Sequence, residues 1–302
     1  MSQPSPPLTL PAYAKINLDL RILGLLPDGY HDVRTVLQSV RLHDTLTFTP
    51  VAGPFVIVGN EPSMPTDASN LIWRAAELLA AVAAPRRRVA GVRVDVVKRI
   101  PAQAGLGGGS ADAAAALLAL CRLWDLPLTV TDLATLAARL GADVPFFLAG
   151  GTALGTGRGD DVSPLVEPPA TAVLVVVPPF GVSTPDAYRW FDLDGPPRRV
   201  VARRRSAPPS WPRWATDLRN DLEAPVSRRH PAIGRIVRRL RALGADHAAM
   251  SGSGSAVFGL FADDIAAAAA HAAFTRRGVK AWLTATLPRR AVAQAGRRAL
   301  GR

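Results

Sequence analysis

A glycine-rich segment, residues 101–111, has the residue types that can bind a phosphate group through the main chain. It lies between an expected strand at 92–97 and an alanine- and leucine-rich helix expected at 110–124, so backbone amides at the helix start can converge on an anion. Its four glycines let the chain approach phosphate oxygens closely. No lysine follows them as in a Walker segment, and Ser110 takes the third glycine position of the dinucleotide fingerprint. The segment therefore predicts a phosphate site of another kind, with a purely structural turn as the alternative.

Two charged residues elsewhere could act on a hydroxyl group. Apolar and polar residues alternate over residues 15–22, which predicts a strand with one buried face and places Lys15 and Asn17 together on its exposed face. Asp143 follows an expected helix end at Gly141. Residues of these types in such positions are more often solvated charges, so the pattern alone leaves a structural and a catalytic interpretation open.

The elements that must position these residues form a mixed pattern of strands and helices. A helix is expected after Asn70, which can cap it, and it stops before Pro85. Further strands are expected at 33–40, 45–49, 152–154, 171–177, 256–261 and 280–287, and further helices at 131–140, 233–243 and 264–275. Residues 192–217 show neither period, which predicts a long loop. The composition shifts near 160–170, so we expect two α+β domains, residues 1–165 and 166–302.

Composition limits the class of protein. The chain has 302 residues, 48% hydrophobic and 20% charged, which is typical of a folded protein and long enough for two cores. Its single cysteine, Cys121, lies among leucines and predicts a reduced, cytoplasmic protein without disulfides. We expect no signal peptide and no membrane partner. The net charge of +12 could serve nucleotides or nucleic acid, or could be a solvated arginine-rich surface.

Three motifs in order carry a family resemblance. Pro101-x-x-x-Gly-Leu-Gly-Gly-Gly-Ser110 resembles the phosphate loop of the galactokinase, homoserine kinase, mevalonate kinase and phosphomevalonate kinase (GHMP) superfamily. Residues 11–18 resemble its first motif and residues 250–258 its third. The resemblance covers about residues 10 to 290 and implies two lobes, an N-terminal one like a ribosomal-protein fold and a C-terminal ferredoxin-like α/β sandwich.

The resemblance also implies an ATP-dependent kinase and its nucleotide site. Asn70 and Lys98 resemble positions that line the adenine pocket, although Asn70 could be only a helix cap and Lys98 only a solvated strand end. The remaining residues implied to bind ATP are those of the glycine-rich segment: Pro101, Ala102, Gln103, Ala104, Gly105, Leu106, Gly107, Gly108, Gly109, Ser110 and Ala111. A second glycine-rich turn near the phosphates is implied at Ser251, Gly252, Ser253 and Gly254. Mg²⁺ is expected to arrive with ATP, with no protein-held transition metal.

Within the superfamily, residues 28–31, 141–147 and 220–223 resemble the branch that phosphorylates the 2-hydroxyl of 4-diphosphocytidyl-2-C-methyl-D-erythritol, a step of non-mevalonate isoprenoid synthesis. That likeness implies Asp143 as catalytic base and Lys15 as the lysine that orients the hydroxyl. The substrate-binding residues implied are Asn17, Tyr30, His31, Thr184 and Tyr188. Tyr30 and Tyr188 would stack on the cytosine and His31 would read its edge. Tyr188 could equally be an ordinary helix residue.

Two rival interpretations are weighed against this one. A homoserine or mevalonate kinase would share the phosphate motifs, but its acceptor has no base for the residues at 30, 31 and 188 to stack on. A basic RNA-binding module is the rival from another class, because arginines between 198 and 214 alternate with tryptophans. We expect a small-molecule substrate, no nucleic acid partner, and a monomer or homodimer. The role of Asp112, a carboxylate beside a predicted phosphate site, is left open.

Overall fold

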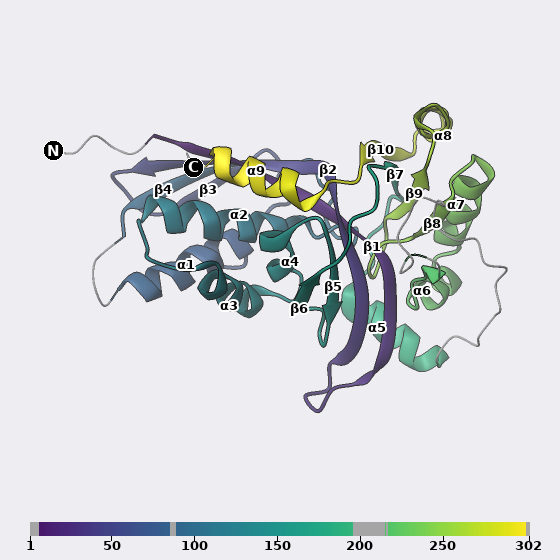
Figure 1. Ribbon diagram of the computed structural model, residues 1–302, viewed down its shortest axis with the longest axis horizontal. Helices are drawn as coiled ribbons and strands as arrows, with labels where there is room; N and C mark the ends of the chain where they lie inside the picture. Colours follow the sequence, from purple (N-terminus) through teal and green to yellow (C-terminus); the bar gives the residue numbers. More distant parts are fainter. Residues whose placement is uncertain (1–5, 85–88, 196–214, 216, 300–302) are drawn as a thin grey trace.

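A computed structural model of the protein describes residues 6–84, 89–195, 215 and 217–299. Two sheets form its frame, a six-stranded one with strand order β3-β4-β2-β5-β6 and β1 paired to β2, and a four-stranded one with order β10-β7-β9-β8 (Figure 1). All described strand pairs are antiparallel except β3 with β4. This confirms the predicted mixed α+β class. The path of the predicted loop at 192–217 falls largely outside the described residues.

The first sheet and its helices hold the glycine-rich segment. The strands are β1 (Leu8–Leu25), β2 (His31–Val51), β3 (Val56–Gly59), β4 (Gly91–Val97), β5 (Thr152–Thr156) and β6 (Asp161–Pro164), and the helices are α1 (Leu71–Ala83), α2 (Gly108–Leu123), α3 (Val130–Leu140) and α4 (Val144–Ala149). Alanines and leucines of α2 are buried against α1 and the sheet. Packing along its whole length therefore holds in place the helix that starts at the glycine-rich segment.

The second sheet lies at the other end of the molecule (Figure 1). Its elements are β7 (Ala172–Val177), α5 (Thr184–Asp194), α6 (Glu223–Arg229), α7 (Pro231–Ala242), β8 (His247–Met250), β9 (Val257–Phe261), α8 (Asp264–Thr275) and β10 (Lys280–Ala285). Strand β7 is buried on both faces. Leu174 and Val176 pack with the helices of this sheet, whereas Val173 and Val175 join a core shared with β1, β2 and Leu106 of the glycine-rich segment. Because successive side chains of a strand point to opposite faces, β7 contributes to both cores and so connects the two sheets.

Lys15 and Asn17 of β1 were expected on an exposed face, and this prediction is wrong because both residues are buried. The two side chains do point the same way, because Lys15 Nζ donates a hydrogen bond to Asn17 Oδ1 at 2.6 Å. Each residue is nevertheless only 3% exposed. The reason is tertiary: the glycine-rich segment and the turn at 251–254 cover this face of the strand. The strands expected at 33–40 and 45–49 are also one continuous strand, β2.

The last described helix, α9 (Arg289–Ala299), returns to the first sheet and packs on β1 (Figure 1). No helix was expected here, although arginine and alanine are strong helix formers. Val292 of α9 lies so close to Gly150 that a Cβ on Gly150 would be 2.7 Å from Val292 Cγ1. The predicted boundary at 165/166 falls between β6 and β7, and we propose it as the division between two lobes, with α9 docked back on the first. No helix within the described ranges is both long and apolar enough to cross a bilayer.

Candidate active site

The glycine-rich segment leads from β4 into the first turn of α2. Gly107 is the N-cap of α2, with φ of 72°, and no side chain caps the helix. The amides of the first turn therefore face the site without a side-chain partner, which suits an anion at a helix N-terminus. A Cβ on Gly107 would lie 2.5 Å from Phe147 Cζ and 3.1 Å from Lys15 Cγ. This glycine is needed both for its backbone angle and for the close approach of two side chains.

The second glycine-rich turn, residues 251–254, joins β8 to β9 and interlocks with the first segment. Ser251 Oγ donates to Gly105 O at 2.9 Å, and Ala256 N donates to Ala104 O at 3.0 Å. A Cβ on Gly105 would lie 2.2 Å from the carbonyl oxygen of Ser251. Two glycine turns that are about 150 residues apart in sequence thus share one side of the site.

Lys15, Asn17 and Asp143 meet beside these turns. Lys15 Nζ lies 3.4 Å from Asp143 Oδ2, and the backbone N–H of Lys15 donates to Leu106 O at 3.0 Å. Asn17 Nδ2 donates in turn to Thr35 Oγ1 at 2.8 Å, which fixes the orientation of its amide. Asp143 is the N-cap of α4, and its side chain is 40% exposed. A buried ammonium is therefore paired with a carboxylate that an incoming molecule can reach.

The residues predicted to bind a base lie where the β1–β2 hairpin approaches α5 (Figure 1). The rings of His31 and Tyr188 are 4.7 Å apart at 32°, and His31 Nε2 lies 2.8 Å from Asp192 Oδ1. Burial raises the pKa of Tyr188 to about 12, and the negative charge of Asp143 adds to the shift. Tyr188 is therefore a neutral phenol at neutral pH.

Tyr30 and Thr184 make different contacts. The guanidinium of Arg158 lies over the ring of Tyr30 at 4.2 Å and also pairs with Asp28, so Arg158 covers one face of that ring. Tyr30 is 58% exposed and keeps a surface for another ring. Thr184 Oγ1 is 2.9 Å from Ser253 Oγ, which places Thr184 at the second glycine-rich turn.

Lys98 and Asn70 are both already hydrogen-bonded. Lys98 lies next to Gly108 of the glycine-rich segment, and Asn70 precedes Leu71, which approaches Gly109. Asn70 Oδ1 accepts from Ile72 N at 2.9 Å as the N-cap of α1, and its Nδ2 donates to Pro65 O at 2.6 Å. Lys98 Nζ donates to Asp112 Oδ2 at 2.6 Å and also contacts Asp44. Asp112 therefore points to a lysine, and this pairing explains how a carboxylate can lie beside a predicted phosphate site.

Few protein oxygens near the glycine-rich segment are available to a divalent cation. Within the described chain no group of three or more His, Cys, Asp or Glu side chains could hold a metal. Mg²⁺ commonly takes only one or two protein oxygens and completes its shell with phosphates and water. The half-buried Ser110 hydroxyl on the first turn of α2 fits such a role, so the residues suit an ion carried by a nucleotide.

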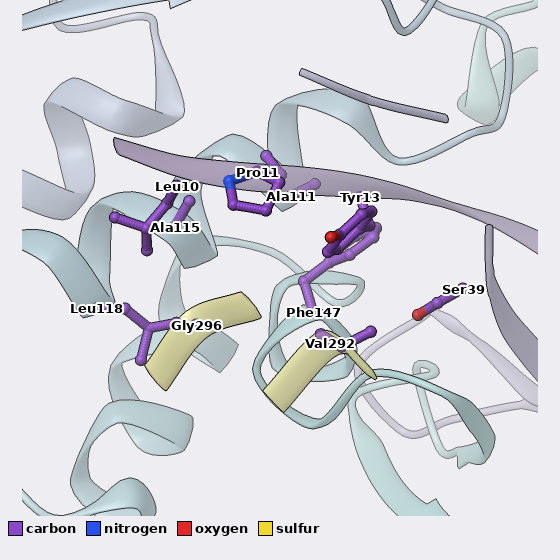
Figure 2. Close-up of a pocket in the computed structure, with 11 residues that line it drawn as sticks. Leu10, Pro11, Tyr13, Ser39, Ala111, Ala115, Leu118, Phe147, Val292 and Gly296 are labelled. Carbon is purple, nitrogen blue, oxygen red and sulfur yellow. The ribbon is translucent and has the colours of Figure 1, made fainter. Parts of the chain in front are cut away.

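A small cavity of about 40 Å³ lies behind this site, between β1, α2 and α9 (Figure 2). Ala111 and Ala115 of α2, Phe147 of α4 and Val292 of α9 point into it, with the Tyr13 ring beside them (Figure 2). Its walls are largely apolar and it is far smaller than a nucleotide pocket. The cavity is therefore too small to be a candidate nucleotide site.

Sequence reasoning missed three residues that shape the site. Asp44 Oδ1 accepts from the backbone N–H groups of Arg99 and Ile100, at 2.5 and 2.8 Å, and so shapes the entry to the glycine-rich segment. Asp192 contacts His31, and Arg158 contacts Tyr30. These pairs are separated by 55 to 161 positions in the chain, and no local pattern signals them.

The chain matches known proteins along most of its length. Residues 70–151 match the family described as GHMP kinases N terminal domain, and residues 205–280 match GHMP kinases C terminal. It is similar to the 4-diphosphocytidyl-2-C-methyl-D-erythritol kinase of Pelotomaculum thermopropionicum, with 44% identity over 260 residues, 85% of this chain and 90% of the relative.

Solved structures show the same relationship. A crystal structure of 4-(cytidine 5'-diphospho)-2C-methyl-D-erythritol kinase has a TM-score of 0.76 at 37% identity, over 92% of this chain and 99% of that one. Homoserine kinase from Cytophaga hutchinsonii has a TM-score of 0.66 at 17% identity, over 95% and 96% of the two chains, and shares the fold alone. The chain is a GHMP kinase and belongs to the family of 4-diphosphocytidyl-2-C-methyl-D-erythritol kinases.

Proposed function

We propose that the protein transfers the γ-phosphoryl group of ATP to the 2-hydroxyl of 4-diphosphocytidyl-2-C-methyl-D-erythritol, giving the 2-phosphate and ADP in the methylerythritol phosphate pathway of isoprenoid synthesis. The observation that carries the chemistry is the Lys15–Asp143 pair, 3.4 Å apart, beside two interlocked glycine turns. Family membership supports the choice of substrate.

The transfer we propose is direct, without a phosphoenzyme. Asp143 accepts the proton of the 2-hydroxyl, and the oxygen forms a bond to the γ-phosphorus as the bond to the β-phosphate oxygen breaks. Lys15 places a positive charge where the alkoxide develops and, through Asn17, is held to one position. Backbone amides at the start of α2 cradle the phosphates. The proton ends on Asp143 and the electron pair of the broken bond leaves with ADP.

The cytidine end is proposed to lie between the β1–β2 hairpin and α5. Tyr188 and Tyr30 offer ring faces for stacking, and His31 can hydrogen-bond the base edge. The rings of His31 on the hairpin and Tyr188 on α5 are 4.7 Å apart, which supports a base pocket between these two elements. Thr184, at the second glycine-rich turn, is proposed to contact the substrate between these two ends.

Mg²⁺ is proposed to enter with ATP. Bound to the phosphates, it would neutralise part of their negative charge, and Ser110 is the side chain that we place beside it. A cytoplasmic location is proposed because the reaction needs ATP and the one cysteine is buried in the core. The arginines between 198 and 214 that motivated the RNA-binding rival all lie outside the described residues. Arg289, at the start of α9, donates hydrogen bonds to Glu167 through its backbone N–H and to Thr152 O through its guanidinium.

A substrate comparison tests the proposal. The purified protein, with ATP and Mg²⁺, is given the diphosphocytidyl alcohol, homoserine or mevalonate, and ADP release is measured. We expect turnover with the first alone. Turnover with homoserine or mevalonate but not with the cytidine compound would contradict the assignment, since those acceptors have no base to stack.

A further inference from the structure

Residues 219–222 form a short link between β1 and the second glycine-rich turn. Leu20 N donates to Arg219 O at 2.7 Å, and Asp221 N donates back to Leu20 O at 2.9 Å, so Asn220 lies beside Leu20 in a parallel bridge. Its position is therefore set by the same strand that carries Lys15 and Asn17.

The carboxamide of Asn220 holds the turn by its main chain. Nδ2 donates to Met250 O at 2.8 Å and to Gly252 O at 2.7 Å, and Oδ1 accepts from Leu222 N at 2.9 Å. Asn220 is only 8% exposed. A flipped amide would place an oxygen against two carbonyl oxygens, so these contacts define one orientation.

The turn that Asn220 holds touches the Lys15–Asn17 pair directly. Asn17 N donates to Ser251 Oγ at 3.3 Å. A Cβ on Gly252 would lie 3.1 Å from Asn17 Oδ1 and 3.3 Å from Lys15 Nζ. A displacement of the turn by one ångström would therefore move the surroundings of the lysine ammonium.

We propose that Asn220 is a positioning residue for the phosphoryl transfer. By binding the carbonyls of Met250 and Gly252, it fixes the second glycine-rich turn at the distance from Lys15 and Asn17 that the reaction requires. The inference rests on the proposed function and adds to it, because Asn220 acts through the turn and contacts neither Lys15 nor Asp143. Geometric errors of this size can cost on the order of 10²-fold in rate.

Asn220→Asp is the sharpest test because it keeps the size of the side chain and removes both N–H donors. The ionised carboxylate would face two carbonyl oxygens and push the turn away. At pH 8 we expect kcat per folded molecule to fall about 10²-fold, with a smaller change in KM for the cytidine substrate, whose base pocket is formed elsewhere. At lower pH the carboxyl group gains a proton that can be donated to one carbonyl, so the ratio of variant to wild-type kcat should rise. A purely structural role would lower the melting temperature without this recovery.

Asp221→Asn is the matched control on the same link. Its side chain accepts from Ile22 N at 3.0 Å and pairs with Arg219, and it contacts no residue of the turn. We expect wild-type kcat for this variant at every pH. Wild-type kcat in folded Asn220→Asp would overturn the inference, whereas an inactive wild-type enzyme would instead contradict the proposed function.

Gly252→Ala keeps the inference testable if Asn220→Asp does not fold. It moves the same turn from the other side, because the added Cβ approaches Asn17 and Lys15 and the residue has φ of 54°. We expect a fall in kcat about as large as that of Asn220→Asp. A folded Gly252→Ala protein with wild-type kcat would show that the position of the turn does not matter for the reaction.

Discussion

Lys98 Nζ lies 2.6 Å from Asp112 Oδ2 and also contacts the carboxylate of Asp44, so one ammonium joins two buried acids at the start of α2. Burial raises the pKa of Asp112, Lys98 opposes the rise, and the charge of Asp44 adds to it. Desolvation alone would lower the pKa of Lys98, but the two carboxylates outweigh it and raise that pKa. The cluster fixes the first turn of α2 to the end of β4.

Asp112 should make the stability of the protein depend on pH. Its pKa is raised from 3.8 to about 7 in the folded protein, so between these values the folded state holds a proton that the unfolded chain has lost. The contribution of Asp112 to stability is therefore complete below about pH 4 and is lost as the pH rises towards 7. Asp112→Asn, which is neutral at every pH, should flatten this slope in denaturant unfolding curves measured from pH 4 to 8. An unchanged slope would contradict the shift.

Asp143 should be required for the chemical step. Asp143→Asn keeps the shape of the side chain but cannot take a proton, so we expect kcat to fall on the order of 10²-fold or more. The melting temperature should also fall, because the buried ammonium of Lys15 loses its carboxylate partner, so kcat is compared per folded molecule. Asp95→Asn is the control, an exposed carboxylate on β4 paired with Arg93. Near-normal kcat in Asp143→Asn would remove Asp143 from the role of base.

Lys15 should affect both rate and stability. Lys15→Met removes the ammonium next to Asp143 and also leaves Asn17 Oδ1 without its donor in a buried place. We expect kcat to fall about 10²-fold and the melting temperature to drop, as measured by steady-state kinetics and thermal unfolding. A loss of stability with unchanged kcat would mean that Lys15 is only structural.

The contact between His31 and Asp192 should set the affinity for the cytidine end. Asp192→Ala leaves His31 free to rotate, so KM for the diphosphocytidyl substrate should rise several-fold while kcat changes less. Tyr188→Ala removes a stacking face worth about 1–3 kcal/mol, so its KM should rise about tenfold or more. Asp186→Ala is the control on the same helix, because its carboxylate pairs with Arg189. Equal KM values for Asp192→Ala and Asp186→Ala would contradict the prediction.

Replacing Gly107 should disturb the site for two reasons, its left-handed backbone angle and the close approach of the Phe147 and Lys15 side chains. Alanine there has a left-handed φ of 72°, which costs about 1–2 kcal/mol, and its Cβ would collide with Phe147. Gly278→Ala is the matched control, with φ of 71° and nothing within 4 Å of the added Cβ. Both variants should lose similar backbone stability, but only Gly107→Ala should raise KM for ATP about tenfold or more. Equal effects on KM would mean that the close approach has no role in nucleotide binding.

Much of the architecture could be predicted from local pattern. The alternation at residues 15–22, the cap at Asn70 and the glycine run before α2 each depend on neighbours in sequence, so they correctly gave a strand, a helix start and a helix N-terminus. The α9 helix was not predicted, although its arginines and alanines favour a helix. What the sequence could not show is that this helix packs on β1, which is distant in the chain.

The sequence by itself determined the residue types, the main-chain geometry of the glycine turns and the family to which they belong. The tertiary structure alone decided that Lys15 is buried, that Lys98 is shared between Asp44 and Asp112, and that Asn220 holds the second turn. Each of these contacts joins residues that are distant in the chain, and their pairing depends on how the two sheets pack. The local pattern of a sequence predicts which face of a helix or strand is apolar. It does not predict which polar group from a distant part of the chain will contact the opposite face.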